Sequence, residues 1–189
     1  MATVLNLRNS SGGLTPVSSA DPVPVSQVTK SDWAINASAT FTRPNDTTTY
    51  AGGDLVANST TAGSVTPMAF TVAPVPAGSF FVRRCRLYKS GANVNNAAFR
   101  LHLWSVSPTP ANGDNGEFST SGSASYLGAL DVPSMLAFTD GAAGSGYPLV
   151  GSSITVKLSS GQIVYGLLEA RGAYPPAASE VFTAVLEAE

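Results

Sequence analysis

Short runs of alternating apolar and polar residues, separated by Gly, Pro and Asn turns, constrain this chain more than any other feature. Residues 37–42 alternate with period two and end at the turn Arg43-Pro44-Asn45-Asp46, and residues 79–89 form the longest such run. Within residues 163–170 both the odd-numbered and the even-numbered positions carry apolar side chains, which is typical of a central strand. No segment carries an apolar stripe of period 3.6 with helix caps, and residues 134–138 are expected to form one helical turn at most. The pattern therefore predicts an all-β protein.

The spacing of these runs indicates how the strands are arranged. The 189 residues include 18 Gly and 13 Pro, and only 12% are charged, which disfavours a coiled coil or a helical bundle. Short strands at irregular spacing are typical of an antiparallel β-sandwich or barrel, and a body of about 150 residues fits a jelly-roll-like double sheet best. The other strands are expected at residues 55–57, 68–72, 97–104, 125–130, 154–158 and 180–188.

Two regions are predicted along the chain. Residues 1–30 are expected to form an extended N-terminal arm, because its glycines and prolines break any helix, and residues 31–189 to form the β-sandwich domain. The arm is either a free linker or a segment that lies along another subunit. Met1–Asn6 lacks the basic and apolar regions of a signal peptide, so synthesis and folding in a host cytoplasm are expected. Because no run approaches the ~18–20 apolar residues of a spanning helix, no membrane partner is predicted.

The sequence offers little for catalysis or metal binding. His102 is the sole histidine, which excludes His-based metal clusters, and Cys85 is the sole cysteine, expected to be a buried, inert thiol. The segment Asp114-Asn115-Gly116-Glu117 is expected to be a solvated turn, with a weak calcium site as the alternative, and Gly141–Gly146 a flexible loop. We therefore predict no catalytic residue, no cofactor and no metal. The hypothesis of a glycoside-cleaving enzyme is supported only by the presence of carboxylates that could act as its acid and base: Asp114, Glu117, Asp131, Asp140 and Glu169.

The most informative group of residues is a set of side chains predicted to face outward from two strands. Alternation turns one set of side chains inward: Phe81, Cys85 and Leu87 on the first strand, and Phe99, Leu101 and Leu103 on the second. If these strands pair as a hairpin, the opposite face gathers the predicted protein-interaction residues: Arg84, Arg86, Tyr88, Arg100, His102 and Trp104. Arg, Tyr and Trp are enriched at interface hot spots. A protein partner ranks above single-stranded nucleic acid because the sequence pI is about 5.3. The alternative is that the arm or neighbouring loops cover this face.

Several short motifs follow one another in an order that resembles small structural proteins of tailed bacteriophages. They cover residues 50–131 and are Tyr50-Ala51-Gly52-Gly53-Asp54-Leu55-Val56, Phe81-Val82-Arg83-Arg84-Cys85-Arg86-Leu87, Phe99-Arg100-Leu101-His102-Leu103-Trp104, Ser107-Pro108, Asp114-Asn115-Gly116-Glu117-Phe118 and Tyr126-Leu127-Gly128. The resemblance implies a virion protein on the capsid surface, of the capsid decoration (cement) type. Its implied partners are the major capsid protein and further copies of itself, with a trimer as one arrangement.

A second function remains open from the sequence. Jelly rolls also serve as lectin domains, so the chain could be a carbohydrate-recognition module of a tail fibre or receptor-binding protein. On that hypothesis Trp33, Tyr147 and Tyr174 are exposed and stack on sugars, while Asp114 and Asn115 hydrogen-bond to their hydroxyls.

Overall fold

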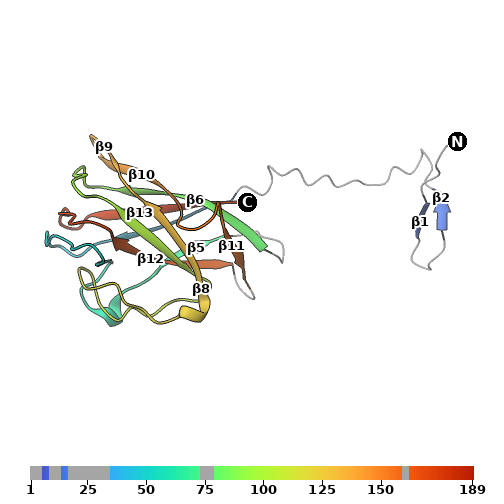
Figure 1. Ribbon diagram of the computed structural model, residues 1–189, viewed down its shortest axis with the longest axis horizontal. Helices are drawn as coiled ribbons and strands as arrows, with labels where there is room; N and C mark the ends of the chain where they lie inside the picture. Colours follow the sequence, from blue (N-terminus) through green and yellow to red (C-terminus); the bar gives the residue numbers. More distant parts are fainter. Residues whose placement is uncertain (1–5, 9–13, 17–34, 73–78, 159–161) are drawn as a thin grey trace. The chain divides into compact units, whose positions relative to one another are not determined.

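The regular structure is almost entirely β-strand and divides into two units (Figure 1). The computed structural model describes residues 6–8, 14–16, 35–72, 79–158 and 162–189. In the first unit, Met1–Asp32, strands β1 (Asn6–Arg8) and β2 (Leu14–Pro16) pair antiparallel. The second unit is Trp33–Glu189. Most of the predicted N-terminal arm and Trp33 lie outside the described residues, so the arm stays a prediction.

The second unit is one sheet of antiparallel strands that curls into two facing layers. Its described strands are β3 (Ile35–Thr42), β4 (Leu55–Val56), β5 (Met68–Thr71), β6 (Ser79–Lys89), β7 (Phe99–Trp104), β8 (Tyr126–Val132), β9 (Leu136–Phe138), β10 (Gly141–Pro148), β11 (Ile154–Lys157), β12 (Ile163–Ala170) and β13 (Val181–Ala188). Short 3-10 turns cover Ala62–Ser64 and Ser123–Ser125. Among these described elements, no helix is long and apolar enough to cross a membrane.

The strand order defines two layers. What we call the β6 layer runs β3–β13–β6–β10, with β11 beside β6 and β9 beside β10. The β7 layer runs β8–β7–β12, with both β4 and β5 on the far edge of β12. Strand β10 joins the layers, because Ala142–Gly146 pairs with β6 and Tyr147–Pro148 pairs with β8. The predicted all-β, sandwich-like antiparallel fold is confirmed.

The core lies between the two layers. Alternation turns Leu101 of β7, Leu130 of β8 and Leu186 of β13 inward, and each is at most 1% exposed. Phe99 packs edge-on against Phe182, with 5.4 Å between ring centroids, and so joins β7 to β13 across the core. Burying such side chains contributes about 1.5–3 kcal/mol each. The predicted burial of Cys85 is also confirmed, and burial raises the pKa of its thiol to about 12.

Strand β6 departs from simple alternation. Glu187 of β13 pairs with Arg84 and the next residue, Ala188, pairs with Val82, so Arg83 is an extra residue in a β-bulge. On the two sides of the bulge, the alternation of inward and outward side chains along β6 is therefore offset by one residue. Phe80 and Val82 therefore face the core, whereas Phe81 is 40% exposed. The prediction that Phe81 faces inward was wrong, although Cys85 and Leu87 beyond the bulge do face inward.

Two segments that were expected to be irregular or helical form a hairpin instead. Residues 136–138 are strand β9 rather than a helical turn, and Gly141–Gly146 lies in strand β10 rather than in a flexible loop. The glycines of β10 serve close packing: a Cβ atom on Gly146 would lie 2.6 Å from Sγ of Cys85, and one on Gly144 2.7 Å from Cγ1 of Val132. Glycine here reflects the tight approach of β10 to its neighbours.

Candidate functional site: the outer face of the β6 layer

The register of the β6 layer places five outward side chains in one row across the sheet. Thr183 of β13 lies opposite Thr40 of β3 on one side and Tyr88 of β6 on the other. Ala143 of β10 lies opposite Tyr88, and Leu136 of β9 lies opposite Ala143. The small Ala143 therefore sits between the large side chains of two flanking strands, which hollows the face at this point.

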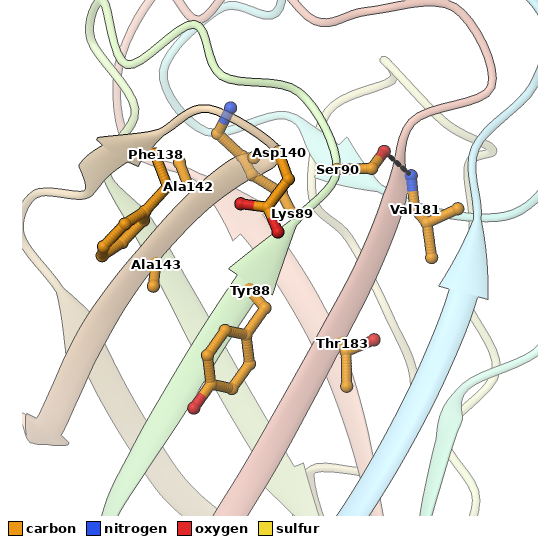
Figure 2. Close-up of a pocket in the computed structure, with 10 residues that line it drawn as sticks. Tyr88, Lys89, Ser90, Phe138, Asp140, Ala142, Ala143, Val181 and Thr183 are labelled. Atoms are coloured by element: carbon orange, nitrogen blue, oxygen red, sulfur yellow. Dashed lines mark hydrogen bonds between the residues drawn. The ribbon is translucent and has the colours of Figure 1, made fainter.

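We call this hollow the β10 groove. It consists of two adjoining pockets, of about 450 Å³ and 460 Å³, which share Tyr88, Phe138 and Ala143. Figure 2 shows Phe138 and Tyr88 on two sides of Ala143, with Asp140 at one end. The first pocket is completed by Lys89, Ser90, Asp140, Gly141, Ala142, Val181 and Thr183, and the second by Arg86, Ser134, Met135, Leu136, Gly144 and Ser145.

Nearer the other end of β6, the same face carries what we call the arginine–aromatic patch: Phe81, Arg83, Arg84 and Tyr147. The guanidinium of Arg83 lies 5.4 Å from the centre of the Phe81 ring, a cation–π contact. Phe81 is 40% and Tyr147 56% exposed, and both arginine side chains are more than 40% exposed. A hydrogen bond and ion pair with Glu187, followed by a weaker interaction with Tyr147, raise the pKa of Arg84. The patch thus combines exposed rings with oriented cations.

Arg86 lines the second pocket of the groove on the side nearer the patch. Its Nε is 2.6 Å from Oε1 of Glu187, and its Nη1 donates to the hydroxyl of Tyr88 at 3.1 Å. Glu187 also pairs with Arg84, so one carboxylate holds two arginines in place. The three predicted interaction residues of β6 therefore lie on one outward face.

The predicted single surface does not form. Strand β6 pairs with β13, β10 and β11, whereas β7 pairs with β8 and β12, so the expected β6–β7 hairpin was wrong. The loop 90–98 carries the chain from one layer to the other, and its backbone is anchored by Nζ of Lys89 on the carbonyls of Gly91 and Asn93. Arg100 and His102 consequently lie on the outer face of the opposite layer.

Trp104 was expected to be exposed and is not. It is 2% exposed and packs with Leu55, Ala57 and Leu167 in a small cluster outside the main core. The loop segment that carries Phe118 covers this cluster, so Trp104 is unavailable to a partner.

His102 belongs to a polar network on the outer face of the β7 layer. Its Nε2 lies 2.9 Å from Oε2 of Glu169, and its Nδ1 lies 3.1 Å from the hydroxyl of Tyr126. Nη1 of Arg171 donates to Oε1 of Glu169 at 2.7 Å, and the imidazole stacks on Phe118 with 4.4 Å between ring centroids. These polar groups satisfy one another, so we assign the network a structural role. On the same face Arg100 pairs with Asp131 at 2.5 Å.

This network predicts a pH dependence of stability. Burial alone would raise the pKa of Glu169, but hydrogen bonds from His102 and Arg171 outweigh it and hold the pKa below its ordinary value. The carboxylate therefore stabilises the fold fully above the unfolded-state pKa of about 4.3, and this contribution is lost as pH falls through the lower folded-state pKa. Urea unfolding at pH 6 and below pH 4 should show a smaller acid loss for Glu169→Gln than for wild type. Glu117→Gln, at an exposed glutamate, should keep the wild-type slope; equal slopes for all three proteins would contradict the prediction.

The predicted solvated turn at Asp114 is instead a buried polar centre. Asp114 accepts from Nη2 of Arg43 at 2.8 Å, from the hydroxyl of Tyr50 at 2.6 Å and from the backbone N–H of Ala57 at 2.7 Å. The Arg43 and Asp114 side chains are both fully buried. Asp114 is therefore unavailable to calcium or to a sugar, because its oxygens are already occupied within the fold.

A second buried ion pair lies close by. Nζ of Lys89 is 3.2 Å from Oε1 of Glu180, and the hydroxyl of Tyr174 donates to that carboxylate at 2.7 Å. Burial lowers the pKa of Lys89 and raises that of Tyr174. The expectation that Tyr174 is exposed for sugar stacking was wrong: it is 0% exposed and stacks parallel to Tyr50, with 6.3 Å between ring centroids.

Sequence reasoning missed the residues that shape the groove on its β9 side. Leu136 and Phe138 are 66% and 51% exposed, and the turn that follows them brings Asp140 to the groove. The available signal was the Asp140-Gly141 dipeptide after the apolar run 135–138, which favours a tight hairpin.

No protein-family model and no curated protein matches the chain. Within the described part of the chain, no group of three or more His, Cys, Asp or Glu side chains is placed to hold a metal ion.

Proposed function

We propose that this protein is a capsid decoration (cement) protein of a tailed bacteriophage, which binds the outer surface of the capsid through the arginine–aromatic patch. The observation that carries the proposal is the patch itself. Phe81 and Tyr147 expose large rings beside the oriented guanidinium groups of Arg83 and Arg84. Aromatic residues and arginine are enriched in the buried centres of protein interfaces, where a few such residues supply most of the binding free energy.

The fold supports a structural role of this kind. Within the β6 layer the order is β3–β13–β6–β10, and β8–β7–β12–β5 follows in the other, so strands distant in the sequence lie side by side in both. This order supports the finer assignment of the sandwich as a jelly roll, which is built from two Greek keys and occurs in viral capsid domains. The resemblance of residues 50–131 to tailed-phage structural proteins points to the same setting.

The expected partners are the major capsid protein and further copies of this chain. A repeating lattice presents many equivalent sites, so an oligomer that engages several of them gains avidity from contacts that are individually modest. We propose that the protein holds neighbouring capsid subunits together on the virion surface, and that particles stripped of it lose their DNA at a lower temperature.

Replacement of the patch arginine should separate binding from folding. We expect purified Arg84→Ala, added to particles that lack the protein, to bind with at least tenfold lower affinity than wild type, because truncation of a hot-spot residue costs about 2 kcal/mol or more. Cosedimentation with the particles measures the affinity, and the melting temperature checks folding. Tyr147→Ala should show a comparable loss.

Arg100→Ala is the matched control. It removes an arginine that is also paired to a carboxylate, but on the opposite layer, where Arg100 lies 2.5 Å from Asp131. It should bind particles like wild type. If Arg100→Ala loses binding while Arg84→Ala retains it, the capsid-facing surface is the β7 layer and the patch assignment is wrong.

A further inference from the structure

The β10 groove is lined by aromatic rings at its centre. Tyr88 and Phe138, 36% and 51% exposed, contribute to both pockets, and Ala143 lies between them (Figure 2). Each pocket, at about 450 Å³, has the volume of a small-molecule site. Two pockets of nearly equal size that share the same two rings suit a ligand made of repeating rings.

Several polar groups of the groove can hydrogen-bond a ligand. Asp140 has no ion-pair or hydrogen-bond partner in the part of the chain that the structure describes, and the same holds for the hydroxyl groups of Ser134 and Ser145. The hydroxyl of Tyr88 accepts a hydrogen bond from Arg86, which leaves its own O–H available to donate. The groove thus presents several acceptors and hydroxyl donors beside apolar ring surface.

In the first pocket, which Asp140 lines, the charges select against an anionic ligand. Lys89 is 3% exposed and pairs with Glu180. Arg86, which lines only the second pocket, shares the carboxylate of Glu187 with Arg84. Asp140 is therefore the one charged lining residue of the two pockets that lacks a partner of opposite charge among the described residues. A phosphate, a nucleic acid or an acidic sugar would meet an uncompensated carboxylate, whereas a neutral polyol would find a strong hydrogen-bond acceptor.

We infer that the β10 groove binds a neutral oligosaccharide, with one sugar ring in each pocket. The C–H faces of the rings stack on Tyr88 and Phe138, and Asp140 accepts hydrogen bonds from sugar hydroxyls. The tail-fibre hypothesis placed sugar recognition on other residues, of which Tyr174 and Asp114 are buried. This inference does not rest on capsid attachment, because the arginine–aromatic patch occupies a different part of the β6 layer.

The inference can be tested with the purified full-length chain on an array of neutral hexose and N-acetylhexosamine oligosaccharides, with sialylated glycans as the acidic comparison. We expect binding to at least one neutral oligosaccharide and none to its sialylated form. Titration calorimetry with the bound oligosaccharide should show at least tenfold weaker binding for Tyr88→Ala and for Phe138→Ala. Asp140→Asn, which keeps the shape but removes the charge, should weaken binding about three- to tenfold.

Tyr147→Ala is the matched control, since it removes an exposed tyrosine from the patch rather than from the groove. It should bind the oligosaccharide like wild type and yet lose particle attachment, which separates this inference from the proposed function. The inference is overturned if no neutral oligosaccharide binds at millimolar concentration, or if folded Tyr88→Ala and Phe138→Ala bind like wild type. It is equally overturned if these two variants lose particle attachment instead, which would make the groove a protein-docking site.

Discussion

An Asp114→Ala variant is expected to unfold with a free energy about 3–5 kcal/mol below that of wild type. The substitution leaves the guanidinium of Arg43 buried without its carboxylate, and it also removes the acceptor for the Tyr50 hydroxyl and for the backbone N–H of Ala57. Because domains of this size are stable by about 5–15 kcal/mol, the loss is a large fraction of the total. Urea unfolding followed by tryptophan fluorescence or circular dichroism measures it.

Two further variants identify the cause of that loss. Asp140→Ala deletes the same carboxylate from an exposed turn where it has no described partner, so it should change the free energy of unfolding by less than about 0.5 kcal/mol. The double variant Arg43→Met/Asp114→Leu removes both charges and should recover part of the stability, since an unpaired buried charge is the main cost. If Asp114→Ala and Asp140→Ala lose the same small amount, the buried pair does not stabilise the protein as described.

Phe99→Ala should cost about 3–5 kcal/mol, because it opens a cavity at the centre of the core. Phe99 is 0% exposed, and its ring packs edge-on against Tyr174 at 5.3 Å and Phe182 at 5.4 Å. It therefore links β7 to β13 of the opposite layer. The same contact supports Tyr174, whose hydroxyl binds Glu180, so the substitution loosens a buried ion pair as well.

Phe138→Ala provides the matched comparison for Phe99→Ala. It deletes the same ring from a position that is 51% exposed on β9, and it should lower the free energy of unfolding by less than about 1 kcal/mol. Thermal and urea unfolding of the two variants should therefore differ clearly. A loss below about 1 kcal/mol for Phe99→Ala as well would mean that the layers are not joined at this residue.

The small number of charges in this chain has a structural consequence. Of its 22 Asp, Glu, Lys and Arg residues, four form fully buried ion pairs in the described part of the chain, Arg43–Asp114 and Lys89–Glu180. Several of the remainder are paired on the outer faces, as Arg84 and Arg86 are with Glu187. The β6 layer thus keeps apolar and hydroxyl-bearing surface over much of its outer face, which suits contact with other molecules.

Much of the secondary structure could be predicted from the sequence. Strand β12 was predicted with its observed bounds, 163–170. Its odd-numbered and even-numbered positions are both mostly apolar, which is typical of a central strand that is buried on both faces. Strands β3, β6, β7 and β13 were predicted within a few residues of their ends, because apolar and polar residues alternate along them. Strand β9 was missed because its three residues are all apolar and do not alternate. Strand β10 was missed because glycine weakens the strand signal, and only the close packing around Gly144 and Gly146 explains why glycine stands there.

The candidate site was predicted only in part. The outward direction of Arg84, Arg86 and Tyr88 follows from alternation on β6, but Phe81 does not, because the bulge at Arg83 is decided by pairing with β13. Asp114 was predicted to be exposed, because its neighbours in the sequence are typical of a turn, but it is buried. Its burial depends on the hydrogen bond from Arg43, which lies 71 residues away in the chain.

The sequence by itself determined that this protein is built from antiparallel strands, and which face of most strands turns inward, because alternation and turn residues act over a few neighbouring positions. Only the tertiary structure decided that β6 and β7 belong to opposite layers, which divides one expected surface into two. It also decided that the hairpin of β9 and β10 lies beside β6 and hollows the groove. Strand neighbours depend on contacts between residues far apart in the chain, and no local pattern encodes those contacts.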